Sequence, residues 1–238
     1  MTKHPGARRV HRAASDEDAF VSGVLESSIW ARTHTRHLVF GVLAVAIAIF
    51  LFVVLRNSRV RTSQQAAVEL DRLRGTVQSG NVQIARQDIQ TYLRTYGRTA
   101  SGQEARLMLG QLQLQAGEAK NAIETLRPLA GDVETSMGYN AALMLASAYE
   151  LDKQNDQADR TYLRIAQDAR FEYQTREALD LAARLRADNG NPAGAIQLYE
   201  RILNTFDQGQ PQMDPERSAY EMRLAELRAA AASPAGRS

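Results

Sequence analysis

The segment Ala195-Ile196-Gln197-Leu198-Tyr199 (AIQLY) places a large aromatic side chain four residues after an alanine. The same arrangement of an alanine and a large side chain four residues on occurs three times earlier, at Ala85/Ile89, Ala122/Leu126 and Ala158/Tyr162. Successive alanines are 37, 36 and 37 residues apart. A regular period of this length predicts a chain built from stacked copies of one small structural unit.

A second feature recurs with the same period. Thirteen residues before the last three alanines, a pair of residues ends in a small side chain, at Leu109-Gly110, Leu145-Ala146 and Ala182-Ala183. The first unit departs from this pattern, because Arg72-Leu73 occupies the equivalent place. Two helices that cross closely need a small residue at the crossing and a larger side chain beside it. The pattern therefore predicts helical hairpins, each of which buries its open face against the next.

This pattern resembles the tetratricopeptide repeat, a helix-turn-helix unit of about 34 residues with the motifs W-x2-L-G-x2-Y and A-x3-F. The resemblance covers about 110 residues, although these segments contain no tryptophan and their intervals are longer. It implies an all-α solenoid of about four helical hairpins over residues 62–232, in preference to an unrelated helical bundle. The last helix, from Pro215 to about Ala232, is predicted to cap the array. Residues 233–238 are predicted to form a disordered tail.

Glycine, asparagine and proline interrupt the helical periodicity after Ser63. The predicted breaks lie at Gly80-Asn81, Gly97, Gly117, Gly131, Asn155, Asn189-Gly190-Asn191 and Gly209-Gln210-Pro211. At Asn191-Pro192 and Asp214-Pro215 a side-chain acceptor precedes a proline, which suits the first residues of a helix. We therefore expect new helices to begin at these two places.

An unbroken apolar run extends from Leu38 to Leu55 without a charged side chain. As a helix its 18 residues reach about 27 Å, close to the ~30 Å hydrocarbon core of a bilayer. A buried core helix would normally keep some polar positions. A cleavable signal peptide would lack the long segment before this run and would show a small-x-small site after it. The run therefore predicts a single transmembrane helix over residues 37–56.

The segment before this helix divides into two parts. Residues 1–15 lack hydrophobic periodicity and are predicted to form a disordered basic tail. Over residues 16–36, apolar residues recur at helical spacing up to Trp30, at Phe20, Val21, Val24, Leu25 and Ile29. This part is predicted to be an amphipathic helix on the membrane surface, with a nascent helix in a mobile tail as the alternative.

The residue types in the segment after the apolar run argue against a catalytic, metal-binding or nucleic-acid-binding site there. The chain has no cysteine, and its four histidines lie before the run or at its start, at His4, His11, His34 and His37. From the run onward 23 basic residues balance 23 acidic residues, so the net positive charge that nucleic acid requires is missing. The carboxylates Asp152, Asp156 and Asp159 are interpreted as a solvated turn. We expect no enzyme activity, no cofactor, metal or nucleic-acid site and no small-molecule substrate.

A second resemblance concerns the layout of the whole chain. The acidic stretch Asp16-Glu17-Asp18, one anchor, and degenerate repeats that begin near Arg72-Leu73 and Gly80-Asn81 resemble the YfgM-type proteins. These are single-span proteins of the bacterial inner membrane and ancillary subunits of the SecYEG translocon. The resemblance implies a cytoplasmic amino terminus and periplasmic repeats beside the translocon and periplasmic chaperones.

Charge near the span bears on this topology. Arg56, Arg59 and Arg61 follow the span closely, whereas Arg32 and Arg36 precede it, and this narrow count favours cytoplasmic repeats. An exported amino tail would, however, carry six basic residues across the membrane, while long domains translocate largely irrespective of charge. We expect the repeats outside the cytoplasm.

Arrays of this kind bind ligands on the concave face formed by their first helices. The predicted face consists of Leu107, Gln111, Leu114, Leu143, Ser147, Glu150, Asp180 and Arg184. The alternative is that its three leucines belong to the core. The lysine and asparagine pattern that clamps chaperone tails is missing, and pairs four residues apart, Glu172/Arg176 and Asp180/Arg184, are interpreted as exposed helix supports.

Two functions remain open from the sequence. The first is a membrane-anchored protein that binds other proteins, holding exported chains or chaperones near the Sec translocon. The second is a scaffold for envelope or cell-division assemblies that has no such holding activity.

Overall fold

The computed structural model describes residues 35–78, 80–206 and 215–232, and every regular element in these ranges is an α-helix. The chain divides into two compact units, residues 1–60 and 61–238. The predicted tails over residues 1–15 and 233–238, and nearly all of the predicted amphipathic segment over residues 16–36, lie outside the described residues.

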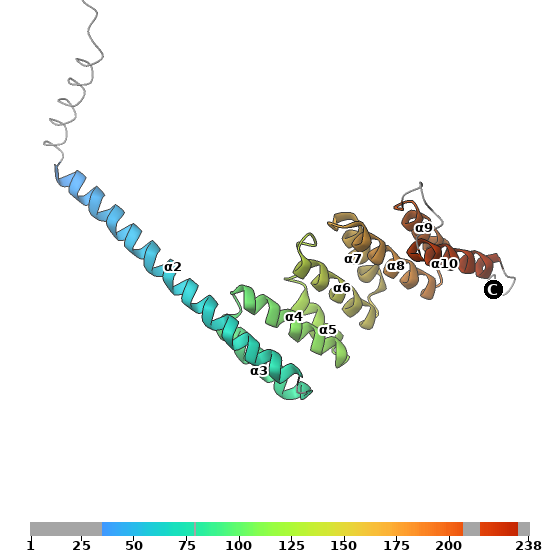
Figure 1. The fold of residues 1–238 in the computed structure, drawn as a ribbon, viewed down its shortest axis with the longest axis horizontal. Coiled ribbons are helices and arrows are strands. Elements are labelled where there is room, and N and C mark those ends of the chain that lie inside the picture. The colour runs from blue at the N-terminus through green and yellow to red at the C-terminus, as the bar shows by residue number, and fades with distance from the viewer. Residues whose placement is uncertain (1–34, 79, 207–214, 233–238) are drawn as a thin grey trace, which may run out of the picture. The chain divides into compact units, whose positions relative to one another are not determined.

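Nine helices follow one another in the described residues, and they are labelled in Figure 1. They are α2 (Thr35–Gln78), α3 (Val82–Tyr96), α4 (Ala100–Gln115), α5 (Ala119–Leu126), α6 (Ser136–Leu151), α7 (Asn155–Asp168), α8 (Glu172–Asp188), α9 (Pro192–Leu203) and α10 (Pro215–Ala232). From residue 61 onward, neighbouring helices pair as hairpins: the carboxyl part of α2 with α3, then α4/α5, α6/α7 and α8/α9, with α10 against α9. The prediction of an all-α array of about four hairpins and a terminal helix is confirmed.

Polar side chains define where several of these helices begin. Asn191 Oδ1 accepts a hydrogen bond from the Gly194 N–H at 2.9 Å, and α9 begins at Pro192 as predicted. Thr99 and Thr135 cap α4 and α6 in the same way, through bonds from N–H groups three residues on. One break was missed altogether, because the residues between α7 and α8, Ala169 to Phe171, include neither glycine nor proline.

The turns inside the four hairpins share one backbone feature, a residue with positive φ. Gly80, Gly117 and Gly190 have φ values of 79°, 74° and 77° at the first, second and fourth turns. At the third turn this residue is Lys153, with φ of 61°. The left-handed conformation costs little for glycine but strains a residue with a Cβ atom, so the third turn is the least relaxed of the four.

All seven residues of the predicted repeat signature are buried: Ala85, Ala122, Leu126, Ala158, Tyr162, Ala195 and Tyr199. The close crossing between α4 and α5 shows why a small residue is needed. A Cβ atom on Gly110 would lie 2.4 Å from Cδ2 of Leu126, which is itself fully buried. The side chain of Leu126 thus occupies the space that glycine leaves open.

The core of residues 61–238 consists of two clusters of buried side chains, and α4 contributes to both. Ala105, Leu109 and Leu112 face the carboxyl part of α2 and α3 in the smaller cluster. Leu107 and Leu114, on the other side of α4, pack against the larger cluster, which runs from α5 to α10. Helix α4 therefore lies between the two clusters and contributes side chains to both.

Side chains also tie each hairpin to the next. Arg186 of α8 donates two hydrogen bonds to the carboxylate of Asp159 in α7, at 2.8 and 2.9 Å. The predicted pair Glu172/Arg176 is present, but Arg176 is not exposed as predicted. It is nearly buried, lies 4.5 Å from the ring centroid of Phe206 and pairs with Glu216 of α10 at 3.2 Å. Glu172, at 3.6 Å, is its more distant partner.

The apolar run lies in the amino-terminal part of α2. Within the described residues, α2 is the helix that is long and apolar enough to cross a membrane, judged by length and composition. None of its apolar window is buried inside the chain, and the side chains from Val39 to Leu55 that are described are exposed. Nothing among the described residues therefore covers these side chains as a protein core would.

Candidate protein-binding face

The predicted face residues come from α4, α6 and α8, the first helices of the second, third and fourth hairpins. Leu107, Leu114 and Leu143 are partly buried and pack against the larger core cluster while keeping some exposed surface. Gln111 and Ser147 are exposed beside them. The leucines thus belong partly to the core, and the polar residues between them are accessible.

The character of the face changes along the array. The predicted positions on α4 and the first two on α6 are leucine, glutamine and serine, which carry no charge. Leu151 at the end of α6 adds an aliphatic side chain that is 44% exposed. On α8 the corresponding residues are Asp180 and Arg184, which form an ion pair at 3.3 Å. One half of the predicted face is therefore uncharged, and the other half carries an ion pair.

Two buried tyrosines hold carboxylates on this face. The hydroxyl of Tyr162 donates to Glu150, and the hydroxyl of Tyr199 donates to Asp180 at 2.8 Å. Burial of the rings, followed by the neighbouring carboxylates, raises the pKa of both tyrosines above the ordinary value. The tyrosine hydroxyls therefore fix the positions of the Glu150 and Asp180 carboxylates. Among the charged residues of the face, Arg184 is the most exposed.

Helix α10 extends the ionic half of the face. A hollow of about 350 Å³ lies between α8, α9 and α10. It is lined by Arg184, Ala187, Asp188, Tyr199, Arg223, Glu226, Leu227 and Ala230. Sequence reasoning treated α10 as a cap and missed its lining residues. The spacing of Arg223, Leu227 and Ala230, four and then three residues, matches that of Leu107, Gln111 and Leu114, and this was the signal available.

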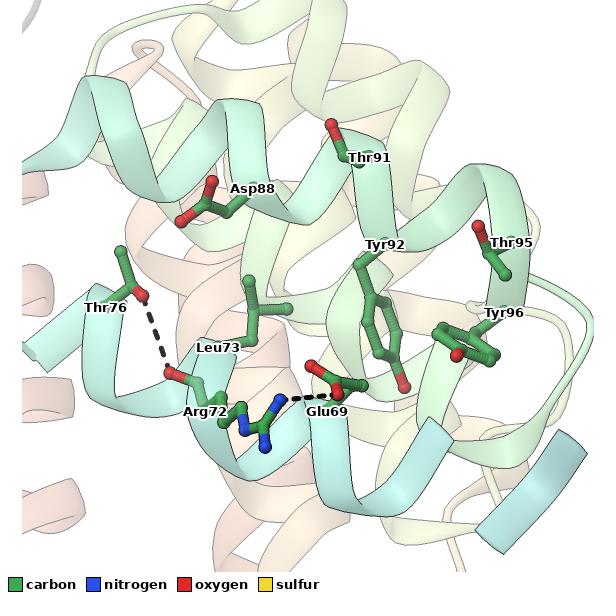
Figure 2. Close-up of a pocket in the computed structure, with 9 residues that line it drawn as sticks. All are labelled: Glu69, Arg72, Leu73, Thr76, Asp88, Thr91, Tyr92, Thr95 and Tyr96. Carbon is green, nitrogen blue, oxygen red and sulfur yellow. Dashed lines mark hydrogen bonds and ion pairs between the residues drawn. The ribbon is translucent and has the colours of Figure 1, made fainter. Parts of the chain in front are cut away.

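A second hollow, of about 340 Å³, lies between α2 and α3 in the first hairpin, and Figure 2 shows its lining. Leu73, Tyr92 and Tyr96 contribute its apolar part, and its rim is lined by Glu69, Arg72, Thr76, Asp88, Thr91 and Thr95. Arg72 pairs with Glu69 at 2.7 Å, on the side of α2 away from Arg74, which pairs with Glu104 of α4. The hollow therefore lies on the face of the first hairpin turned away from α4.

Neither hollow offers a metal site. Across residues 35–78, 80–206 and 215–232, no three histidine, cysteine, aspartate or glutamate side chains gather closely enough to hold a metal ion. The groups that the two hollows do offer are guanidinium, carboxylate, hydroxyl and aliphatic side chains, which suit non-covalent contact with a polypeptide.

Comparisons with known proteins agree with this architecture. The chain matches the tetratricopeptide repeat-like domain over residues 29–229. A tetratricopeptide repeat protein from Parabacteroides merdae aligns with a TM-score of 0.55 and 17% identity, over 70% of this chain and 61% of that chain. The nearly identical TPR-like repeats of a putative kinesin light chain from Podospora anserina align with a TM-score of 0.56 and 18% identity, over 71% and 87%.

The two structural alignments show the fold, and this chain spans about 61% of the length of the Parabacteroides protein. No curated protein matches the chain. Tetratricopeptide repeat folds are typically scaffolds for protein–protein interaction and not enzymes. On the match over residues 29–229, the chain belongs to the tetratricopeptide repeat-like domain family.

Proposed function

We propose that this protein is a membrane-anchored binding module of the YfgM type, which holds exported polypeptides or chaperones near the Sec translocon. The observation that carries the proposal is the pairing of an unburied apolar helix with an array whose first helices present a partly apolar face. The apolar part of α2 supplies the anchor, and α4, α6, α8 and α10 supply the binding surface.

The chemistry of the face suits extended segments. The uncharged half, with Leu107, Gln111, Leu143 and Ser147, offers aliphatic contact and hydrogen bonds without selecting a charge. Such a surface binds many sequences weakly. Tethering compensates for weak binding, because a membrane anchor raises the effective concentration of the module near its partners.

Site-specific crosslinking tests this proposal. The chain has no cysteine, so Gln111→Cys and Ser147→Cys each introduce a single attachment point on the face, and Lys120→Cys on α5 is the matched control. In bacterial membranes we expect the face variants to crosslink to translocon subunits, exported chains or envelope chaperones, and the control to do so much less. Equal yields from all three positions would overturn the proposed face.

Topology forms part of the proposal: an inner-membrane protein with a cytoplasmic amino terminus and a periplasmic repeat domain. The six basic residues that an exported amino tail would carry across the membrane support it, and the long domain after the anchor can translocate largely irrespective of charge. Protease added outside intact spheroplasts should degrade the repeat domain. Its full protection, reversed when the membrane is broken, would place the repeats in the cytoplasm instead.

The ionic half of the face favours a second candidate, a scaffold for a folded partner in envelope or division assemblies. Asp188, Arg223 and Glu226 are exposed there, and no ion pair engages them within the described part of the chain. The full chain in nanodiscs can be offered an unfolded polypeptide and folded envelope proteins separately. Binding of the folded proteins alone would favour the scaffold.

A further inference from the structure

Two arginines stand directly beyond the apolar run of α2. Arg56 follows Leu55, the last residue of the run, and Arg59 follows three residues later. Residues three apart in a helix lie on one side of it, with about 5–6 Å between their Cβ atoms. Both arginines are exposed, so two cationic side chains extend from the same side of the helix at the end of the apolar segment.

This pair lacks the acidic neighbours that other helical arginines have. Arg72, Arg74, Arg184 and Arg217 each pair with a carboxylate three or four residues away, at 2.7, 2.6, 3.3 and 2.9 Å. The sequence, in contrast, has no aspartate or glutamate from Ser27 to Val68. Glu69, the next acidic residue, lies ten positions beyond Arg59, about 15 Å along a helix. The repulsion between Arg56 and Arg59 is therefore not relieved by a charge within reach on their helix.

The depth of the pair follows from the proposed anchoring, on which this inference rests. If the run from Leu38 to Leu55 fills the hydrocarbon core, Arg56 and Arg59 begin about 1.5 and 6 Å beyond it. The headgroup layer on each side of a bilayer is about 5–8 Å thick. Both guanidinium groups then lie at the level of the lipid phosphates.

We propose that Arg56 and Arg59 together bind the phosphate of an anionic lipid headgroup, so that the anchor collects anionic lipid around itself in that leaflet. Guanidinium presents a planar fork of donors that matches the oxygens of a phosphate. A phosphate between the two side chains satisfies those donors and removes the repulsion between the arginines. The surface negative charge of such lipids adds to the attraction.

The test measures which lipids gather around the full-length protein. A single cysteine introduced by Ser63→Cys carries a donor dye, and phosphatidylcholine vesicles contain a trace of acceptor-labelled phosphatidylglycerol or acceptor-labelled phosphatidylcholine. We expect local enrichment of phosphatidylglycerol by at least about fivefold over phosphatidylcholine. The Arg56→Gln/Arg59→Gln variant should lose this preference. Arg160→Gln/Arg201→Gln, which removes the same charge from exposed positions in α7 and α9, should keep it.

The lipid preference of each variant decides whether Arg56 and Arg59 bind lipid phosphate. Preference retained by Arg56→Gln/Arg59→Gln, or lost equally in the control variant, would overturn the inference. Inorganic phosphate at constant ionic strength should leave the preference intact, and its loss would show that lipid is not the source of the phosphate. Flotation with vesicles after an alkaline wash tests anchoring separately. A chain that floats without lipid preference defeats this inference alone, whereas one that fails to float also contradicts the proposed function.

Discussion

The first and third hairpins fill the same helix crossing with different pairs of side chains. At the crossing place the first hairpin has Leu73, with Ile89 at the signature position of its second helix, while the third has Ala146 with Tyr162. All four side chains are buried. The exchange of a large for a small residue on one helix is matched by the reverse exchange on the other. In these two hairpins, a smaller residue on one helix therefore accompanies a larger residue on the other.

The residue before the crossing place differs for another reason. In the second and third hairpins it is Leu109 and Leu145, both buried, whereas in the first it is Arg72, whose side chain is 74% exposed. The later hairpins follow a neighbour that covers this position. Among the described residues no hairpin precedes the first, so an arginine is tolerated there, and this explains why the first unit departs from the repeat pattern.

The largest effect is expected from Ala158→Asp in the third hairpin. Ala158 is fully buried, and an unpaired carboxylate there has no partner to offset its desolvation, so the change should cost more than about 4 kcal/mol and unfold the larger cluster. The matched control is Glu172→Ala, which removes a side chain that is 79% exposed and should change stability by less than about 0.5 kcal/mol. Thermal melts followed by circular dichroism check both, and identical melts would refute the assigned repeat register.

The volume argument is tested at the crossing of α4 and α5. Gly110→Leu forces a side chain onto Leu126 and should destabilise by about 1–3 kcal/mol. Adding Leu126→Ala, which recreates a large residue opposite a small one, should recover part of that loss. Urea unfolding of the two single variants and the double variant gives the coupling energy. Strictly additive costs would mean that volume is not shared between these positions.

Alkaline pH should weaken the later hairpins through their buried tyrosines. The raised pKa of Tyr162 and Tyr199 means that the folded state keeps protons that the unfolded state loses above its pKa of 10.0. Their contribution is fully present below about pH 10 and is lost as pH rises above it, by up to about 1.4 kcal/mol per pH unit for each tyrosine. Tyr162→Phe should flatten the stability profile above pH 10, and an unchanged slope would contradict this account.

A smaller effect is expected at the turn of the third hairpin. Lys153→Gly gives this turn the residue that the other three have and should stabilise the protein by about 0.5 kcal/mol, because relief of left-handed strain exceeds the entropy that glycine loses. Lys120→Gly, inside α5, is the matched control and should destabilise. The midpoint of urea unfolding checks both, and a lower midpoint for Lys153→Gly would contradict the strain.

The smallest effect is expected from Arg72→Leu, which gives the first hairpin the residue of the second. Stability should change by less than about 0.5 kcal/mol, since nothing among the described residues covers this position. Leu145→Arg, the reverse change, should unfold the domain because Leu145 is buried. Calorimetry measures the unfolding temperature of both variants. If Arg72→Leu lowered it as much as Leu145→Arg, the explanation that no neighbouring hairpin covers Arg72 would be wrong.

The sequence was sufficient for the hairpins because their signals are local. The alanine period and the glycine and asparagine breaks reveal each unit without knowledge of its neighbours. The turn after α7 was missed because Ala169, Arg170 and Phe171 carry no turn signal. The break predicted at Asn155 falls slightly earlier, since Asn155 already belongs to α7 and Lys153 takes the left-handed position.

The candidate face was harder to predict because its geometry depends on contacts between helices. Nothing in the order of residues shows that the hydroxyl of Tyr199 reaches Asp180, nor that Arg176 crosses to Glu216. These partners are 19 and 40 residues apart. The role of α10 in lining a hollow was missed although the spacing of Arg223, Leu227 and Ala230 matches that of the predicted face on α4.

The position of α4 between the two core clusters has a practical consequence for the design of truncated versions of the protein. A fragment that starts at Ala100 would lose α2 and α3 and leave Ala105, Leu109 and Leu112 bare along one side of its first helix. An exposed apolar stripe of this kind promotes aggregation and non-specific binding in pull-down experiments. Truncated versions should therefore begin near Thr62, so that they keep the first hairpin, which covers one side of α4.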